Sequence, residues 1–239
     1  MLGYLAIGLE GTLIREENKQ AFARAFGRAI GSLHIGIGRN MGRSHYVMAS
    51  GTSLKKQISD IIEGGRFESV SYKKIEAACG LFWDTIAEEP VVMVPDARET
   101  LEKLGKMGIK VLVSSEMPPK LVSKMVHDLE IPVPGLVEMA LGSKLGFPRS
   151  QHVDVFSKHC RVDFDSFCRK LVIAGINRED MLIANDLKRL SGTEYPISIG
   201  IKNASRSNKS LKIAGAEYLC SGLNTLPDAI NEINNIWKL

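Results

Sequence analysis

Short apolar runs alternate with amphipathic stretches along most of this chain. The run 2–7 is apolar, ends at Gly8 and is typical of a buried strand. Further strands are predicted at 109–113, 136–141, 181–184, 197–201 and 217–220. Helices with one apolar face are predicted over 15–31, 95–105, 118–129, 164–174 and 228–236.

This alternation of strands and helices is typical of βαβ units. It predicts the α/β class, with a Rossmann-like parallel sheet covered by helices on both faces. One region departs from the pattern: residues 32 to about 90 contain the amphipathic stretches 53–62 and 71–87 but no strong strand. We therefore predict a core domain of residues 1–14 and 91–239, with an inserted helical domain at 15–90.

Polar side chains follow four successive predicted strands. They are Glu10 and Thr12 after the first strand, Ser114 and Ser115 after the second, Lys144 after the third, and Asn185 and Asp186 after the fourth. Because the carboxyl ends of parallel strands meet at one edge of a sheet, these residues are expected to form one ligand site. Hydroxyls, a lysine and acidic or amide groups suit an anion such as phosphate together with a cation.

The order of these segments resembles the haloacid-dehalogenase superfamily, especially its phosphoglycolate-phosphatase-like branch. The matching segments are GLEGTL after the first strand, VPDARETLEKL, the serine pair, a lysine, the ND pair and the closing AGAEYLCSGLNTLPDAI. The resemblance covers nearly the whole chain, and it implies that the helical insertion is a cap domain that selects substrates.

The resemblance also implies a mechanism. The first motif of the family is DxDGTL, whose first aspartate attacks phosphorus to form an aspartyl-phosphate. The second aspartate protonates the leaving group and later activates water. A serine or threonine and the lysine hold the phosphoryl oxygens. Magnesium is bound by the first aspartate, a backbone carbonyl and an acidic fourth motif.

Several positions depart from the family motifs. Gly8 stands at the position of the nucleophile, so no covalent intermediate can form there and one magnesium ligand is lost. Glu10 replaces the acid/base aspartate and is the candidate for that role, with a side chain one methylene longer. Thr12 and Ser114 fit the phosphate-binding pattern, and Ser115 replaces the usual asparagine.

The third and fourth motifs leave alternatives open. Lys144 has the expected spacing for the phosphate-binding lysine, and Lys158 is the alternative. The fourth motif matches either with Asn185, an amide, or with Asp186, which would remain a metal ligand. In both cases the motif is less acidic than in the family, so the resemblance implies a weakened magnesium site.

Three functions are compatible with these motifs. The first is a catalytically inactive homologue of a phosphatase that binds a small phosphorylated ligand or a protein partner. The second is an active phosphomonoester hydrolase that forms no covalent intermediate and uses Glu10 as a base. The third is a structural subunit.

Composition excludes some other classes of protein. The chain has 239 residues, 44% of them hydrophobic and 24% charged, as in an ordinary globular protein. Its net charge of +4 is small and its densest basic segment, 202–212, is typical of a solvated loop, so nucleic acid is an unlikely partner. The four cysteines form no CxxC pair, and no apolar run approaches the roughly 20 residues of a membrane helix. A cytoplasmic protein without a membrane partner is therefore expected.

Overall fold

A six-stranded sheet lies at the centre of the computed structural model, which describes residues 1–15, 19–37, 54–65, 70–143, 149–202 and 208–236. The strand order is β3-β2-β1-β4-β5-β6, and all neighbouring strands are parallel. The strands are β1 (Tyr4–Gly8), β2 (Lys110–Ser114), β3 (Met139–Leu141), β4 (Leu171–Gly175), β5 (Ile197–Ile201) and β6 (Tyr218–Cys220). The predicted α/β class with a Rossmann-like parallel sheet is confirmed.

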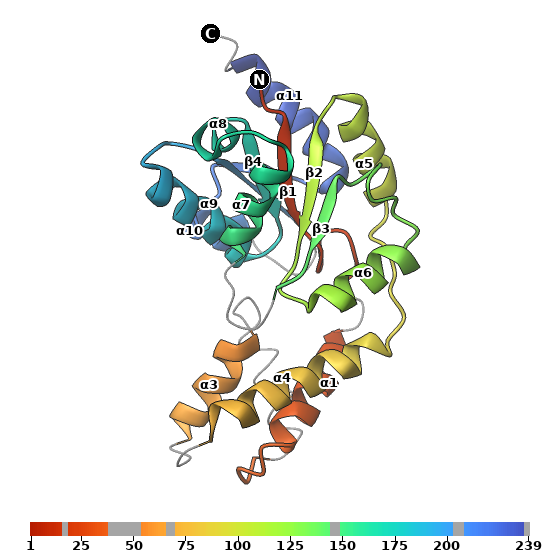
Figure 1. Ribbon diagram of the computed structural model, residues 1–239, viewed down its shortest axis with the longest axis vertical. Helices are drawn as coiled ribbons and strands as arrows, with labels where there is room; N and C mark the ends of the chain where they lie inside the picture. The colour runs from red at the N-terminus through yellow and green to blue at the C-terminus, as the bar shows by residue number, and fades with distance from the viewer. Residues whose placement is uncertain (16–18, 38–53, 66–69, 144–148, 203–207, 237–239) are drawn as a thin grey trace.

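Helices cover both faces of this sheet, as Figure 1 shows. They are α5 (Ala97–Lys106), α6 (Pro119–Asp128), α7 (Ser150–His159), α8 (Phe164–Cys168), α9 (Arg178–Ser191), α10 (Asn208–Ile213) and α11 (Leu226–Ile236). Leu5 and Ile7 of β1 pack in a core shared with α5, α6 and α11, whereas Ala6 faces α7, α8 and α9. Since both faces are covered, the central strands are buried along almost their whole length.

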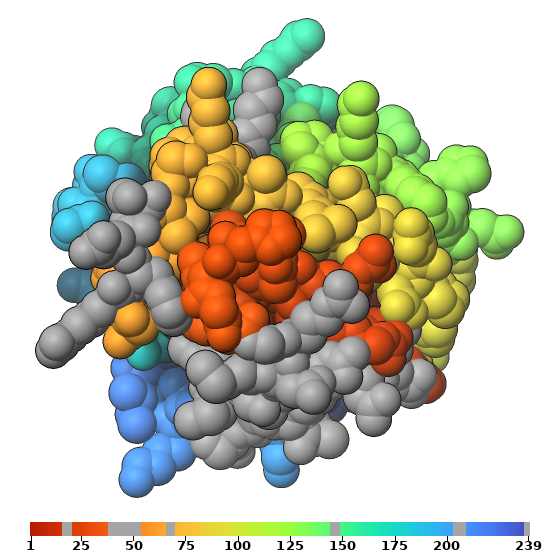
Figure 2. Space-filling view, turned by 90° about the horizontal axis from the view of Figure 1, so that it is seen from below, coloured from red at the N-terminus to blue at the C-terminus, as the bar shows by residue number. Residues whose placement is uncertain are grey.

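Three further helices form a separate layer beyond the sheet (Figure 1): α1 (Lys19–Gly31), α3 (Leu54–Gly64) and α4 (Tyr72–Ala87). They agree with the helical stretches that the sequence predicts in the insertion. The ring centroids of Phe22 and Phe26 lie 6.0 Å and 6.5 Å from that of Phe82, which joins α1 to α4. Figure 2 shows the side chains of α1 and α4 next to each other across this end of the molecule.

Two predicted elements are wrong. The predicted helix at 164–174 ends at Cys168, and Leu171–Gly175 is strand β4. The predicted strand at 181–184 lies inside helix α9. Both segments contain a short apolar run, LVIA and MLIA, and such runs do not distinguish a buried strand from the buried face of a helix. The fourth strand therefore ends at Gly175, and the residues that follow it differ from those predicted.

None of the described helices is both long and apolar enough to cross a bilayer.

Candidate functional site

The carboxyl ends of the central strands bring the first predicted site residues together. Gly8, the last residue of β1, is in register with Ser114, the last residue of β2. A tight turn follows β1, in which Gly11 has φ 71° and the backbone N–H groups of Leu13 and Ile14 both donate to the Leu9 carbonyl. This turn directs Glu10 and Thr12 back to the sheet edge.

The predicted residues of this edge contact one another. The Ser115 hydroxyl donates to Oε1 of Glu10 at 2.6 Å and accepts from the backbone N–H of Met117 at 2.9 Å. Thr12 is 1% exposed, and its hydroxyl has no hydrogen-bond partner among the residues that the structure describes. Glu10, Thr12, Ser114 and Ser115 thus lie at one edge, as the sequence predicts.

An arginine that the sequence does not predict lies at the centre of this edge. Nη1 of Arg149 is 2.8 Å from Oδ1 of Asp180, and the two side chains are 9% and 1% exposed. The same guanidinium donates from Nε to the Ser114 hydroxyl at 3.1 Å and from Nη2 to the Ser114 carbonyl oxygen at 2.7 Å. Arg149 and Asp180 therefore form a buried ion pair, and the other two nitrogens of the guanidinium donate to Ser114.

A histidine links the ends of β2 and β3. Nδ1 of His152 is 2.9 Å from the Ser114 hydroxyl, and Nε2 is 3.2 Å from the Ser143 hydroxyl. Burial, reinforced by the charge of Arg149, lowers the pKa of His152 to about 4, so the imidazole is neutral at pH 7. Because the Ser143 hydroxyl donates to the Ser115 carbonyl, Nε2 must donate to Ser143 and Nδ1 must accept from Ser114.

Three carboxyl groups, those of Asp180, Glu10 and Glu116, interact with the single guanidinium of Arg149. Burial raises the pKa of Glu10, against the opposing charge of Arg149 and the hydrogen bond from Ser115. Burial likewise raises the pKa of Glu116, although Arg149 opposes this shift too. Burial alone would lower the pKa of Arg149, but the carboxylates of Asp180, Glu10 and Glu116 outweigh it and raise that pKa.

Two glycines make room for the Asp180 carboxylate. A Cβ added to Gly8 would lie 3.2 Å from Oδ1 and 3.4 Å from Oδ2 of Asp180, and 3.4 Å from the Thr12 hydroxyl. A Cβ added to Gly175 would overlap the same carboxylate. The space left by the missing side chain at Gly8 is therefore bounded by the buried carboxylate of Asp180, which lies in the first turn of α9.

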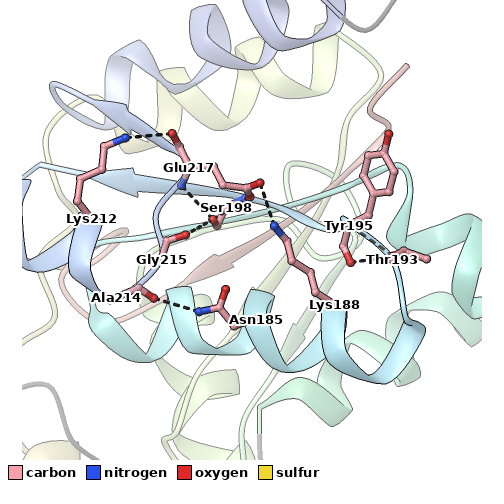
Figure 3. Close-up of polar contacts among 9 residues, drawn as sticks. All are labelled: Asn185, Lys188, Thr193, Tyr195, Ser198, Lys212, Ala214, Gly215 and Glu217. Carbon is pink, nitrogen blue, oxygen red and sulfur yellow. Dashed lines mark hydrogen bonds and ion pairs between the residues drawn. The ribbon is translucent and has the colours of Figure 1, made fainter.

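Asn185 and Asp186 lie elsewhere, because they are two turns into α9. The Asn185 side chain donates to the Ala214 carbonyl at 3.2 Å, within the network that Figure 3 shows. In that network Glu217 accepts from the Ser198 backbone N–H at 2.8 Å, which ties β5 to the segment before β6. Asp186 is 53% exposed beside Arg189, at 3.4 Å. The expectation that these two residues reach the sheet edge is wrong, because the predicted strand before them is part of a helix.

Only one of the two candidate lysines lies within the described residues. Lys158 is exposed on α7 and pairs with Asp154 at 2.7 Å. Lys144 falls outside the described residues.

Known proteins resemble this chain in structure. A search against models of protein families found no match, and a search of curated proteins found none either. Solved structures do match over nearly their whole length. A protein described as a predicted phosphatase from Clostridium acetobutylicum has a TM-score of 0.75 at 16% identity, with 97% of this chain and 99% of that chain covered.

Two other solved structures also match this chain over almost its whole length. A predicted phosphoglycolate phosphatase from Haemophilus somnus has a TM-score of 0.68 at 14% identity, with 98% of both chains covered. A haloacid-dehalogenase-like hydrolase from Streptococcus pneumoniae has a TM-score of 0.68 at 15% identity, again with 98% of both chains covered. The chain has the haloacid-dehalogenase-like fold. At these identities the comparison establishes the fold and leaves the chemistry to the residues of the site.

Those residues do not fit the magnesium ion that this fold family implies. Magnesium prefers carboxylate and carbonyl oxygens. Gly8 offers no carboxylate, and the nearest one, that of Asp180, is paired with Arg149. Within the described ranges, no three His, Cys, Asp or Glu side chains form a group that could hold a metal ion.

Sequence reasoning missed four residues of this site: Ser143, Arg149, His152 and Asp180. One local signal points to Asp180. Asn177 and Asp180 form a capping box at the start of α9, in which the Asn177 backbone N–H donates to Oδ2 of Asp180 at 3.1 Å. An Asn followed three residues later by an acid marks a helix start, which would have placed β4 before it. The contacts of Arg149, by contrast, join segments distant in sequence and leave no such local pattern.

Proposed function

We propose that this chain is a catalytically inactive protein of the haloacid-dehalogenase-like fold that binds a protein partner. One observation carries the proposal. The space beside Gly8, where a nucleophilic side chain would project, is bounded by the carboxylate of Asp180, which Arg149 holds in place. An aspartyl-phosphate mechanism needs both a nucleophile and free space at that point.

The hydroxyls expected to hold phosphate argue against a small phosphorylated ligand at this edge, which leaves the protein partner. Ser114 and Ser115 are 4% and 0% exposed. The Ser114 hydroxyl is bound to Arg149 and His152, and the Ser115 hydroxyl to Glu10 and Met117. An incoming phosphate would have to break these bonds and approach the surrounding carboxyl groups, which is electrostatically unfavourable.

A second candidate function is favoured by one feature, the raised pKa of Glu10. A buried carboxyl group with a raised pKa is suited to act as a general acid or base. In this alternative the chain hydrolyses a phosphate ester without a covalent intermediate, with Glu10 activating water.

Turnover measurements separate the two candidates. Purified protein is assayed with magnesium against p-nitrophenyl phosphate and a panel of sugar phosphates, beside E10Q as the matched variant. We expect no turnover above the buffer rate for either protein. Turnover by the wild type that E10Q abolishes would overturn the proposal in favour of the hydrolase.

Calorimetry tests the nature of the ligand. We expect no heat of binding with inorganic phosphate or sulfate. Saturable binding that is lost in S114A would instead identify the phosphorylated ligand as the occupant of the site.

A further inference from the structure

The oxygens around the Arg149 guanidinium are of the kinds that bind a divalent cation. Its three nitrogens contact a carboxylate oxygen of Asp180, the hydroxyl of Ser114 and the backbone carbonyl of Ser114, at 2.7–3.1 Å. Carboxylate, hydroxyl and carbonyl oxygens are also the ligands of hard cations such as magnesium and calcium. These oxygens are buried, so they need a positive or hydrogen-bonding partner inside the protein.

We propose that the Arg149 guanidinium occupies the place of a divalent cation at this sheet edge, as a permanent positive charge supplied by the chain. The inference rests on the contacts of Arg149 and holds whether or not the chain has a catalytic activity. It accounts for the mismatch between the fold, which implies magnesium, and the residues, which do not form a magnesium site.

Charge balance supports this assignment. The carboxyl groups of Asp180, Glu10 and Glu116 all act on Arg149, and Asp180 is 1% exposed. Without the guanidinium, Asp180 would be a buried carboxylate without its counter-ion, which is strongly destabilising. A cation from solution is one way to restore the balance.

The vacated space would also offer a further oxygen ligand. The buried Thr12 hydroxyl has no hydrogen-bond partner within the described part of the chain. It lies 3.4 Å from the point that a Cβ on Gly8 would take, and Oδ1 of Asp180 lies 3.2 Å from the same point. Removal of the guanidinium would therefore leave a carboxylate, a hydroxyl and a carbonyl without their partner, with the Thr12 hydroxyl close to the same carboxylate.

The experiment replaces Arg149 by methionine, which keeps an unbranched apolar stem and removes the charge. Thermal unfolding is followed in EDTA, in calcium chloride and in magnesium chloride, with sodium chloride added to match ionic strength. The wild type should unfold at the same temperature in all three. R149M should unfold about 10 °C lower in EDTA, and calcium or magnesium should restore about 5 °C in a saturable manner.

Two control variants define the result. R149K keeps a positive charge and should not respond to divalent cations. R149M/D180N removes both partners, so it should be more stable than R149M in EDTA and should not respond either. If R149M is unfolded in EDTA, recovery of its far-UV circular dichroism in calcium supports the inference.

Three results would overturn the inference. The first is a saturable cation response of the wild type, because the ion would then bind beside Arg149. The second is a folded R149M that ignores divalent cations. The third is an R149M that folds in neither condition while R149M/D180N folds, since no cation would then replace the guanidinium.

Discussion

Gly8 and Asp180 have to be considered together. In the sequence Gly8 is a missing nucleophile, whereas in the structure it faces a buried carboxylate that lies against both Gly8 and Gly175. A side chain at position 8 would therefore compete with Asp180 for space. Gly8 departs from the family motif, and the packing of Asp180 also requires a glycine or another small residue at this position.

Gly8→Asp is expected to destabilise the protein and to confer no phosphatase activity. Its Cβ would already be in tight contact with Asp180, and its carboxylate would add a second buried negative charge beside that of Asp180. We expect the free energy of unfolding to fall by about 3 kcal/mol. Urea unfolding measures the stability, and the phosphate-ester assay with magnesium measures the activity.

Gly8→Ala is the matched control, because it adds the Cβ alone. It should cost about 1 kcal/mol, since its contacts of 3.2–3.4 Å need only a small shift of the neighbours. Equal stabilities of the aspartate and alanine variants, or turnover by the aspartate variant, would contradict this account.

Single residues of the site were predictable only where they follow a correctly predicted strand. Glu10, Thr12, Ser114 and Ser115 follow β1 and β2, whose apolar runs are unambiguous, and all four lie at the same sheet edge. The partner that organises this edge, Arg149, comes from a segment 35 residues away from Ser114 in sequence. An ion pair between distant segments has no periodicity, so no local pattern indicates it.

At the scale of elements, α7 is attached to the sheet edge by its histidine. His152 joins the Ser114 hydroxyl at the end of β2 to the Ser143 hydroxyl after β3. The bond with Ser114 requires the neutral imidazole, because Nδ1 accepts in it and the protonated ring would have to donate from Nδ1 instead. The attachment of α7 is therefore sensitive to acid.

Acid should weaken the contribution of His152 to stability. Its pKa is lowered to about 4 in the folded protein, compared with about 6.5 in an unfolded chain. As the pH falls from 6.5 towards 4, the unfolded state takes up a proton that the folded state does not, which favours unfolding. The stability advantage of the wild type over H152Q should shrink by about 2 kcal/mol between pH 7 and pH 4.5.

Urea unfolding at a series of pH values measures this difference. Glu10 and Glu116 act in the opposite direction, because their raised pKa values favour the folded state as the pH falls. The comparison with H152Q cancels their effect. H127Q is the control, because His127 is 89% exposed and lies 3.6 Å from Asp128 in a surface pair of small energy, so its profile should stay close to that of the wild type. A constant gap between wild type and H152Q would disprove the assignment.

The exchange of strand and helix around 164–184 shows the limit of reasoning from periodicity. All five residues of β4 are buried, so the strand shows no alternation of polar and apolar positions. Met181 and Ala184 are the buried face of α9, and their run MLIA resembles a strand. The other strands were predictable because turn or helix signals flank them on both sides.

At the scale of the whole molecule, the helical insertion leaves and rejoins the core at neighbouring points. Ile14 forms an antiparallel bridge with Met93. The Arg15 backbone N–H donates to the Val92 carbonyl and the Val94 N–H to the Leu13 carbonyl, both at 2.8 Å. This pairing is consistent with the predicted boundaries of the insertion, 15–90, which stay a prediction.

Phe82→Ala tests whether the insertion is a domain of its own. Phe82 is buried between the rings of Phe22, Phe26 and Trp83, so its truncation should cost about 4 kcal/mol of local stability. If the insertion is a separate unit, hydrogen exchange should accelerate in α1 and α4 while the β1 amides keep their protection.

Phe167→Ala is the matched control in the core. Phe167 is fully buried against Tyr4 and Phe156, so its loss should accelerate exchange in β1. An equal loss of protection in α1 and β1 in both variants would show a single cooperative unit instead of two domains.

The two glycines that enclose Asp180 also constrain how this sequence can evolve. A side chain at position 8 would press against Asp180. A substitution at position 180 would leave Arg149 without its carboxylate. The effects of changes at these positions are therefore epistatic, so each alone is harmful although some combinations are tolerated. An aspartate at position 8 would therefore need compensating changes at positions 180 and 149 of the same chain.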